Sequence, residues 1–210
     1  MSYILAVHVP IAGLSLIPVL LKWPLALLPV HVVFLELIID PACSIAFEAE
    51  PEESGIMSRP PRNRKEPLFT RKTVAISLLQ GIVVLLITLA IYGFNIQQGR
   101  GESEARALAF VTLVIANLGL IFSNRFWSTT ILSSLRYKNP ALLGITSFTL
   151  VFLGLVIYVP FLREVFHLGA LHPNDLAICF GAGVASIAWF EAVKYLSRRK
   201  NSAMPVKISD

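Results

Sequence analysis

Charged residues and cysteines are scarce in this chain of 210 residues. Only 15% of the residues are Asp, Glu, Lys or Arg, which is too few for a water-soluble domain of this length. The two cysteines, Cys43 and Cys179, lack the spacing of a disulfide framework or of a metal motif. A glycine-rich phosphate loop of the Walker type is missing as well. These absences exclude a soluble P-loop enzyme and a disulfide-stabilised secreted domain.

Hydrophobic residues make up 55% of the sequence, and its mean hydropathy is +0.70. Such a chain places its apolar surface in a lipid bilayer rather than in a single buried core. Six apolar segments have roughly the length, about 17–25 residues, that a helix needs to cross a bilayer. They run approximately over residues 3–21, 25–47, 74–94, 107–122, 141–161 and 176–196. We therefore expect an all-α integral membrane protein, a bundle of six transmembrane helices.

Lysine and arginine collect in alternate links between these segments, and such an excess marks the cytosolic side of a membrane. The three basic groups are Arg59, Arg62, Arg64, Lys65, Arg71 and Lys72, then Arg125, Arg136 and Lys138, and finally Arg198, Arg199, Lys200 and Lys207. In the opposite links, acidic residues offset Arg100, Arg106 and Arg163. This pattern predicts a cytosolic loop over residues 48–73 and both termini in the cytosol. The net charge of +5 therefore reflects topology, and we expect no nucleic-acid partner.

Two carboxylates, Glu36 and Asp40, lie one helical turn apart inside the second apolar segment. Each costs about 2.5–3.5 kcal/mol at the centre of a bilayer unless it faces a partner, water or an ion. Their spacing puts both on one face of a helix, and their oxygens suit hard cations. Pro41 lacks the amide that would bond to Leu37, so we expect the helix to unwind near Asp40-Pro41. Alternatively, the acids pair with a lysine or histidine only to hold helices together.

Motifs around these acids resemble those of a known family. Pro29-Val30-His31 leads into Glu36 and Asp40, and the following link contains Glu50-Pro51, Ile56-Met57-Ser58-Arg59-Pro60-Pro61-Arg62 and Lys65-Glu66-Pro67-Leu68. This order resembles the fifth and sixth helices and the next loop of type II P-type cation-transporting ATPases of the calcium-pump kind. Residues 117–124 resemble the eighth helix, and residues 189–194 resemble the end of the tenth. The chain is therefore similar to the C-terminal membrane domain of such a pump.

The resemblance implies that a cation binds between the membrane helices, with Asp40, Glu36 and, as a third candidate, His8 as ligands. ATP and Mg²⁺ would act in cytosolic domains that belong to the N-terminal portion of such a pump. The family's phosphorylated aspartate, in its Asp-Lys-Thr-Gly setting, does not occur in this sequence. We therefore expect no catalytic residue, no cofactor and no ATP hydrolysis in this chain alone. We expect its location to be the plasma (inner) membrane.

The sequence departs from the calcium-pump pattern at positions that resemble ion ligands. By that resemblance, a ligating glutamate of the fifth helix is Ile11 here, and a nearby ligating asparagine is His8. The acid of the eighth helix is Val114, the amide of the sixth helix is Glu36, and a threonine is Ile39. The cation thus stays open between Ca²⁺, another divalent ion, a monovalent ion and protons. His8 is either a ligand suited to a softer metal or a histidine hydrogen-bonded to a neighbouring helix.

Other polar residues inside the segments are expected to serve packing. We interpret His31 as an interfacial or packing residue. Gln80 and Asn117 are amides that commonly form hydrogen bonds across membrane helices. Glu191 and Lys194 have the i,i+3 spacing of a local ion pair.

Two functions from different classes follow. In the first, the chain is the C-terminal part of a cation pump, present as a fragment, a separately expressed subunit or a gene product begun at an internal methionine. In the second, it is a stand-alone membrane protein without the motor, either a relic or a regulatory subunit. A secondary transporter is disfavoured because the pattern of residues 24–68 is not repeated in the later segments.

Overall fold

The computed structural model describes residues 2–41, 45, 47–49, 70–124 and 139–202. Within these ranges all regular elements are helices, which confirms the all-α prediction. The helices are α1 (Ser2–Leu20), α2 (Pro29–Pro41), α3 (Arg71–Gln97), α4 (Glu102–Asn124), α6 (Pro140–Tyr158), α7 (Pro160–Val165) and α8 (Pro173–Ser202). Most of the cytosolic loop predicted over residues 48–73 lies outside the described residues, as does Cys43.

Five of the described helices, α1, α3, α4, α6 and α8, are long and apolar enough to cross a membrane. Within the second predicted span, residues 25–47, the structure describes the 13-residue helix α2, which begins at Pro29. Pro29 supplies a preset φ at the first helical position. The residues just after Pro41, 42–44, lie outside the described part of the chain.

The fifth predicted span, residues 141–161, is interrupted. Helix α6 ends at Tyr158, and Val159 is extended with φ −84° and ψ 116° before α7 begins at Pro160. A residue that precedes proline is driven out of the helical region by the proline ring, which accounts for the break. At the other end of α6, the Asn139 side chain accepts a hydrogen bond of 3.0 Å from the amide of Leu142.

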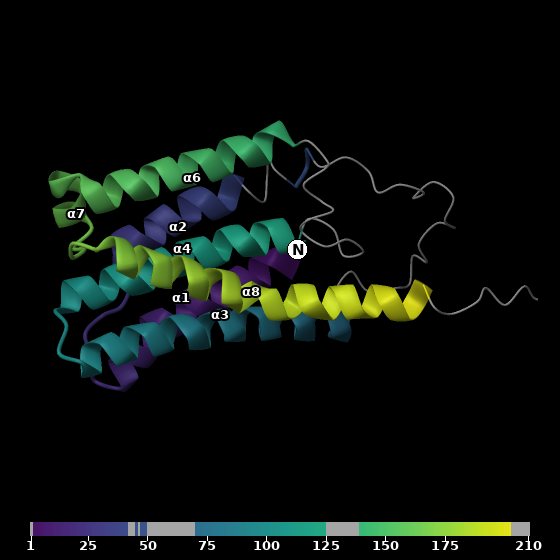
Figure 1. Ribbon diagram of the computed structural model, residues 1–210, viewed down its shortest axis with the longest axis horizontal. Coiled ribbons are helices and arrows are strands. Elements are labelled where there is room, and N and C mark those ends of the chain that lie inside the picture. Colours follow the sequence, from purple (N-terminus) through teal and green to yellow (C-terminus); the bar gives the residue numbers. More distant parts are fainter. Residues whose placement is uncertain (1, 42–44, 46, 50–69, 125–138, 203–210) are drawn as a thin grey trace, which may run out of the picture.

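Helix α4 forms the centre of the bundle. It packs against α8, α3 and α1, and most of its residues are buried. Helix α1 packs mainly against α3, whereas α2 lies against α6, so α1 and α2 do not pack closely along their lengths. Figure 1 shows α6 and α2 on one side of the bundle and α1 and α3 on the other.

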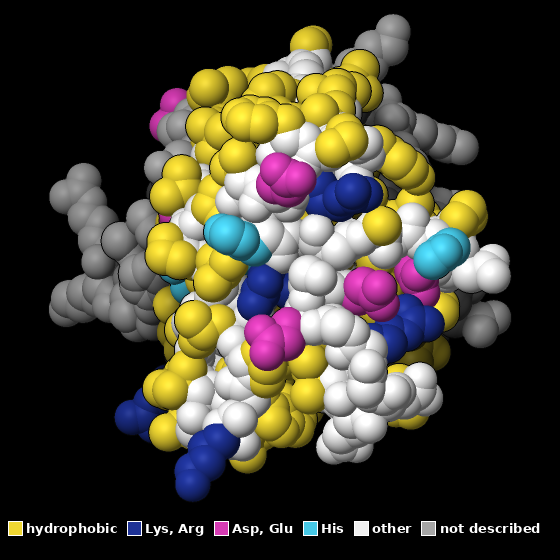
Figure 2. Space-filling model, turned by 90° about the vertical axis from the view of Figure 1, so that its left-hand side faces the viewer, with side chains coloured by type: hydrophobic (Ala, Val, Ile, Leu, Met, Phe, Trp, Pro, Cys, Tyr) yellow, Lys and Arg dark blue, Asp and Glu magenta, His cyan; other side chains and the backbone are white. Residues whose placement is uncertain are grey.

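The links α1–α2, α3–α4 and α7–α8 gather at one end of the bundle, at the left in Figure 1. We call this the loop end. These are the links that the charge pattern places away from the cytosol. In Figure 2, which faces this end, acidic, basic and histidine side chains gather in the middle, and hydrophobic side chains surround them. A polar end ringed by apolar side chains is the arrangement expected where a membrane bundle meets water.

Candidate cation site between α1 and α2

His8 of α1 and Glu36 of α2 face each other across the gap between these helices. The Nε2 atom of His8 lies 3.6 Å from a carboxylate oxygen of Glu36. The side chains are 48% and 38% exposed, so neither is enclosed by the described part of the bundle. This distance is too long for a hydrogen bond. The structure thus brings together two of the three predicted site residues, from helices that are otherwise not closely packed.

The backbone of α1 orients the His8 ring. Its Nδ1 lies 2.8 Å from the carbonyl oxygen of Ile4, one turn earlier in the helix. A carbonyl oxygen can only accept, so Nδ1 carries the proton in this hydrogen bond. In the neutral ring, Nε2 then has a free lone pair, and this is the atom that faces Glu36.

Asp40, the third predicted ligand, lies one turn after Glu36 in the last turn of α2. A spacing of four residues places it on the same face of the helix as Glu36. The side chain of Asp40 lies outside the described part of the structure, so its role stays a prediction. Among the described residues, three or more His, Cys, Asp or Glu side chains do not converge on one point. The site therefore has two described members and one predicted member.

Apolar residues flank the pair along both helices. Ile11 and Ile39, at two positions where the resemblance predicts a polar ligand, are buried in the hydrophobic core, and so is Val114 of α4. The exposed faces of the two helices carry Ile4 and Val33 beside the pair. In apolar surroundings, an unpaired carboxylate costs far more than in water. Glu36 thus requires a proton, a cation or the His8 ring as its partner.

His31 has a structural role, which confirms the packing interpretation. Its Nδ1 accepts a 3.0 Å hydrogen bond from the amide of Leu28, so its Nε2 carries the proton that is donated to the Phe166 carbonyl at 2.8 Å. The ring is fully buried and lies 4.7 Å from the ring centre of Phe110. One histidine thus ties the start of α2 to the α7–α8 link. The contact joins residues 135 positions apart, which local sequence patterns cannot reveal.

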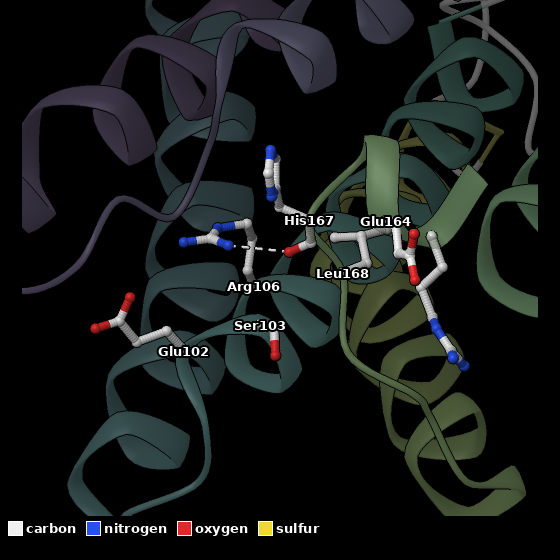
Figure 3. Close-up of a pocket in the computed structure, with 7 residues that line it drawn as sticks. Glu102, Ser103, Arg106, Glu164, His167 and Leu168 are labelled. Atoms are coloured by element: carbon white, nitrogen blue, oxygen red, sulfur yellow. Dashed lines mark hydrogen bonds between the residues drawn. The ribbon is translucent and has the colours of Figure 1, made fainter. Parts of the chain in front are cut away.

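Arg106 of α4 has a similar role that the sequence did not reveal. Its Nε donates to the Leu25 carbonyl at 3.0 Å, and a terminal nitrogen donates to the His167 carbonyl at 2.9 Å. Figure 3 shows this second contact at the wall of a cavity of about 570 Å³, which Glu102, Arg163 and Glu164 also line. Because Arg106 is itself nearly buried and bonded to two links, this cavity is part of the loop-end scaffold.

An ion pair between Arg100 and Asp175 also fixes the loop end. Arg100, between α3 and α4, donates to the Asp175 carboxylate at 2.9 Å, and the amide of His172 donates to the same carboxylate at 3.1 Å. The hydrogen bond to Asp175 raises the pKa of the Arg100 guanidinium above its ordinary value. The contact from Arg100 holds the start of α8 beside the α3–α4 turn, and the contact from His172 closes the first turn of α8.

The polar residues deeper in the bundle behave differently. Gln80 and Asn117 are buried, and among the described residues their amide atoms have no hydrogen-bond partner. Glu191 accepts a 2.6 Å hydrogen bond from the hydroxyl of Ser123 on α4, whereas the side chain of Lys194 lies outside the described part.

Comparison with known proteins identifies the family. Residues 24–196 match the family model described as "Cation transporting ATPase, C-terminus". The chain belongs to this family. It is 30% identical over 202 residues to the calcium-transporting ATPase of Bacillus subtilis (strain 168), covering 94% of this chain and 22% of that protein. The motif-based resemblance to the C-terminal membrane domain of P-type cation pumps is thereby confirmed, and with it a multi-pass membrane protein.

Two further relatives agree. The chain is 24% identical over 176 residues to calcium-transporting ATPase 1 of Yarrowia lipolytica, covering 83% of this chain and 19% of that protein. It is 30% identical over 101 residues to the probable cation-transporting ATPase F of Mycobacterium bovis, covering 48% of this chain and 11% of that protein. The chain thus spans a fifth or less of the length of these two relatives.

Proposed function

We propose that this chain forms the cation-binding part of a P-type ATPase and that the cation passes between α1 and α2. The observation that carries the proposal is the pairing of His8 and Glu36 across an open gap between helices. A half-exposed carboxylate among apolar side chains needs compensation, and a transported cation supplies it. Asp40, one turn further along α2, would add a second carboxylate.

ATP hydrolysis in this proposal takes place outside the chain. Mg²⁺ and ATP would act in cytosolic domains of the N-terminal portion, which is the partner that supplies the driving energy. The plasma membrane is the proposed location. Both termini would face the cytosol, with the loop end on the opposite side, because the basic links adjoin the other end of the bundle.

Substitution of the two carboxylates in the complete protein encoded by the gene tests this proposal. Asp40→Asn and Glu36→Gln keep the size of the side chains but remove the charges that would hold the cation. Both variants should reduce cation-stimulated phosphorylation by ATP, by about tenfold or more. Glu164→Gln, at the loop end, is the matched control and should behave like the unmodified protein. Unchanged cation dependence in both variants would reject the site.

The same phosphorylation measurement distinguishes the pump from the alternative function, a relic or regulatory subunit without a motor. A stand-alone chain would show no phosphorylation by ATP under any cation condition. Under this alternative, the gene would contain no in-frame Asp-Lys-Thr-Gly motif upstream of Met1.

A further inference from the structure

A groove between the end of α3 and the start of α8 is separate from the candidate cation site and from the cavity beside Arg106. Its volume is about 410 Å³, within the range of pockets that hold small ligands. Its apolar wall includes Ala90, Ile91 and Phe94 of α3 and Ile178 of α8. Phe94 and Ile178 are 61% and 55% exposed in the described structure. We call this the α3–α8 groove.

The α3–α8 groove lies at the depth where the hydrocarbon of a bilayer meets the headgroups. The apolar stretch of α3 ends at Gln97, and that of α8 begins at Pro173. Gln98 and Arg100, which follow α3 at the loop end, line the groove together with the apolar side chains. One end of the groove is therefore apolar and the other is polar, as in a phospholipid.

Arg100 is the accessible charge at the polar end of the groove. Its guanidinium donates through one terminal nitrogen to the Asp175 carboxylate at 2.9 Å, and the Arg100 side chain is 38% exposed. The Asp175 side chain is only 9% exposed, and its second oxygen accepts a hydrogen bond from the amide of His172. Among the described residues, the other nitrogens of the guanidinium have no hydrogen-bond partner. They can bind a phosphate, a ligand for which arginine is well suited.

Two carboxylates near Arg100 disfavour a purely anionic headgroup. Asp175 already pairs with the guanidinium, and Glu104 lies in the first turn of α4 close by. The hydrogen bond to Asp175 raises the pKa of the Arg100 guanidinium, and the charge of Glu104 raises it further. Because these two acids face one cation, the polar end favours a ligand that carries a positive group as well as a phosphate.

We propose that the α3–α8 groove binds one phospholipid of the phosphatidylethanolamine class, whose headgroup has a phosphate and a primary ammonium group. The phosphate lies on Arg100 and the exposed amide of Gln98, and the ammonium group faces Glu104. An acyl chain covers the apolar wall at Phe94 and Ile178. This inference goes beyond the proposed function and does not depend on the cation site.

Native mass spectrometry of the full-length protein tests the headgroup. With equal amounts of phosphatidylethanolamine, phosphatidylcholine and phosphatidylglycerol in the detergent, the first should be retained in about threefold excess or more over each of the others. The trimethylammonium group of phosphatidylcholine has no N–H to donate to Glu104. Phosphatidylglycerol would bring a negative charge beside the two acids without a cation.

Glu104→Gln should abolish the preference for phosphatidylethanolamine over phosphatidylcholine, because the partner of the ammonium group loses its charge. The Arg100–Asp175 ion pair stays intact in this variant, so the fold should be kept. Glu164→Gln, in the separate cavity at the loop end, is the matched control and should keep the preference. An unchanged preference in Glu104→Gln, or equal retention of the three lipids by the unmodified protein, would overturn the proposal.

A bulky side chain in the groove tests where the lipid binds. Ala90→Trp fills the apolar wall and should abolish the retained phosphatidylethanolamine. Ala185→Trp places the same side chain at an exposed position of α8 outside the groove, so this control should retain the lipid. Retention that is unchanged in Ala90→Trp would overturn the proposal. So would a structure of the full-length protein in which another protein segment fills the groove, and neither result would bear on the role of Glu36.

Discussion

Polar side chains at the loop end and in the middle of the bundle differ in their hydrogen bonding. At the loop end, His31, Arg106 and Asp175 each hold two or more hydrogen bonds that join separate links. In the middle, His8 and Glu36 lie 3.6 Å apart, and the buried amides of Gln80 and Asn117 have no hydrogen-bond partner in the described part of the chain. The difference is not one of residue type, because each region contains a histidine and an acid.

The comparison separates structural from functional polar groups. A buried group whose hydrogen bonds are all satisfied fixes the fold, because removing it leaves its partners unpaired. A polar group left unpaired in apolar surroundings costs stability and persists where it serves another purpose. The loop end is therefore a scaffold, and we propose that the gap between α1 and α2, where Glu36 carries a charge, takes a ligand.

Removal of Arg106 should give the largest loss of stability. Arg106→Met keeps most of the side-chain volume but leaves the carbonyls of Leu25 and His167 without their donor. The free energy of unfolding should fall by about 3 kcal/mol, because hydrogen bonds from a charged group are lost. Thermal unfolding in detergent, followed by circular dichroism, measures the change. Arg163→Met, in the same cavity, is the control, and an equal loss there would contradict the scaffold role of Arg106.

A methyl group at Gly81 should disturb the contact between α1 and α3, which supports both regions. A Cβ atom at this position would lie 2.6 Å from the Ala6 carbonyl oxygen and 2.7 Å from Cβ of Val9. Gly81→Ala should lower the free energy of unfolding by about 2 kcal/mol, because backbone atoms must shift. Cation binding should weaken as well, since His8 lies between these two contacts.

Gly154→Ala on α6 is the matched control for Gly81→Ala. Nothing lies within 4 Å of a Cβ atom at this position. The control should be neutral or stabilising by about 1 kcal/mol, because alanine favours a helix more than glycine does. Equal losses of unfolding free energy in Gly81→Ala and Gly154→Ala would show that the α1–α3 contact is not as close as described.

Replacement of the buried amides should give the smallest effect, with the opposite sign. Gln80→Leu and Asn117→Leu remove amide groups that have no hydrogen-bond partner. Each variant should be neutral or more stable, by about 1 kcal/mol, because an unpaired polar group is replaced by an apolar one. Thermal unfolding of both variants checks this. A loss of more than about 1 kcal/mol would show that the amides are paired in the membrane.

The sequence predicted the helical class, its apolar spanning helices and the grouping of the links at one end. These features depend on hydropathy and on charge, which act locally along the chain. The interruption at Val159 was also readable in principle, since Pro160 follows it. The start of α2 was less accurate, because this helix begins at Pro29 rather than at residue 25.

The sequence named the members of the candidate site but not their geometry. The energetic cost of Glu36 in an apolar run marked it from composition alone, and resemblance to the pump family added His8. The distance between them could not be predicted, because it depends on how α1 and α2 are held by α3 and α6. The scaffold role of Arg106 and the partner of His31 were missed for the same reason, since both contacts join residues that are distant in the sequence.

Location of a bound cation in the full-length protein tests the central claim most directly. The protein would be crystallised with Mn²⁺, and anomalous scattering would locate the ion. We predict an ion between α1 and α2, about 2.0–2.6 Å from a carboxylate oxygen of Glu36 and the Nε2 atom of His8. An ion bound in the loop-end cavity beside Glu102 and Glu164, with the gap at Glu36 empty, would contradict the account.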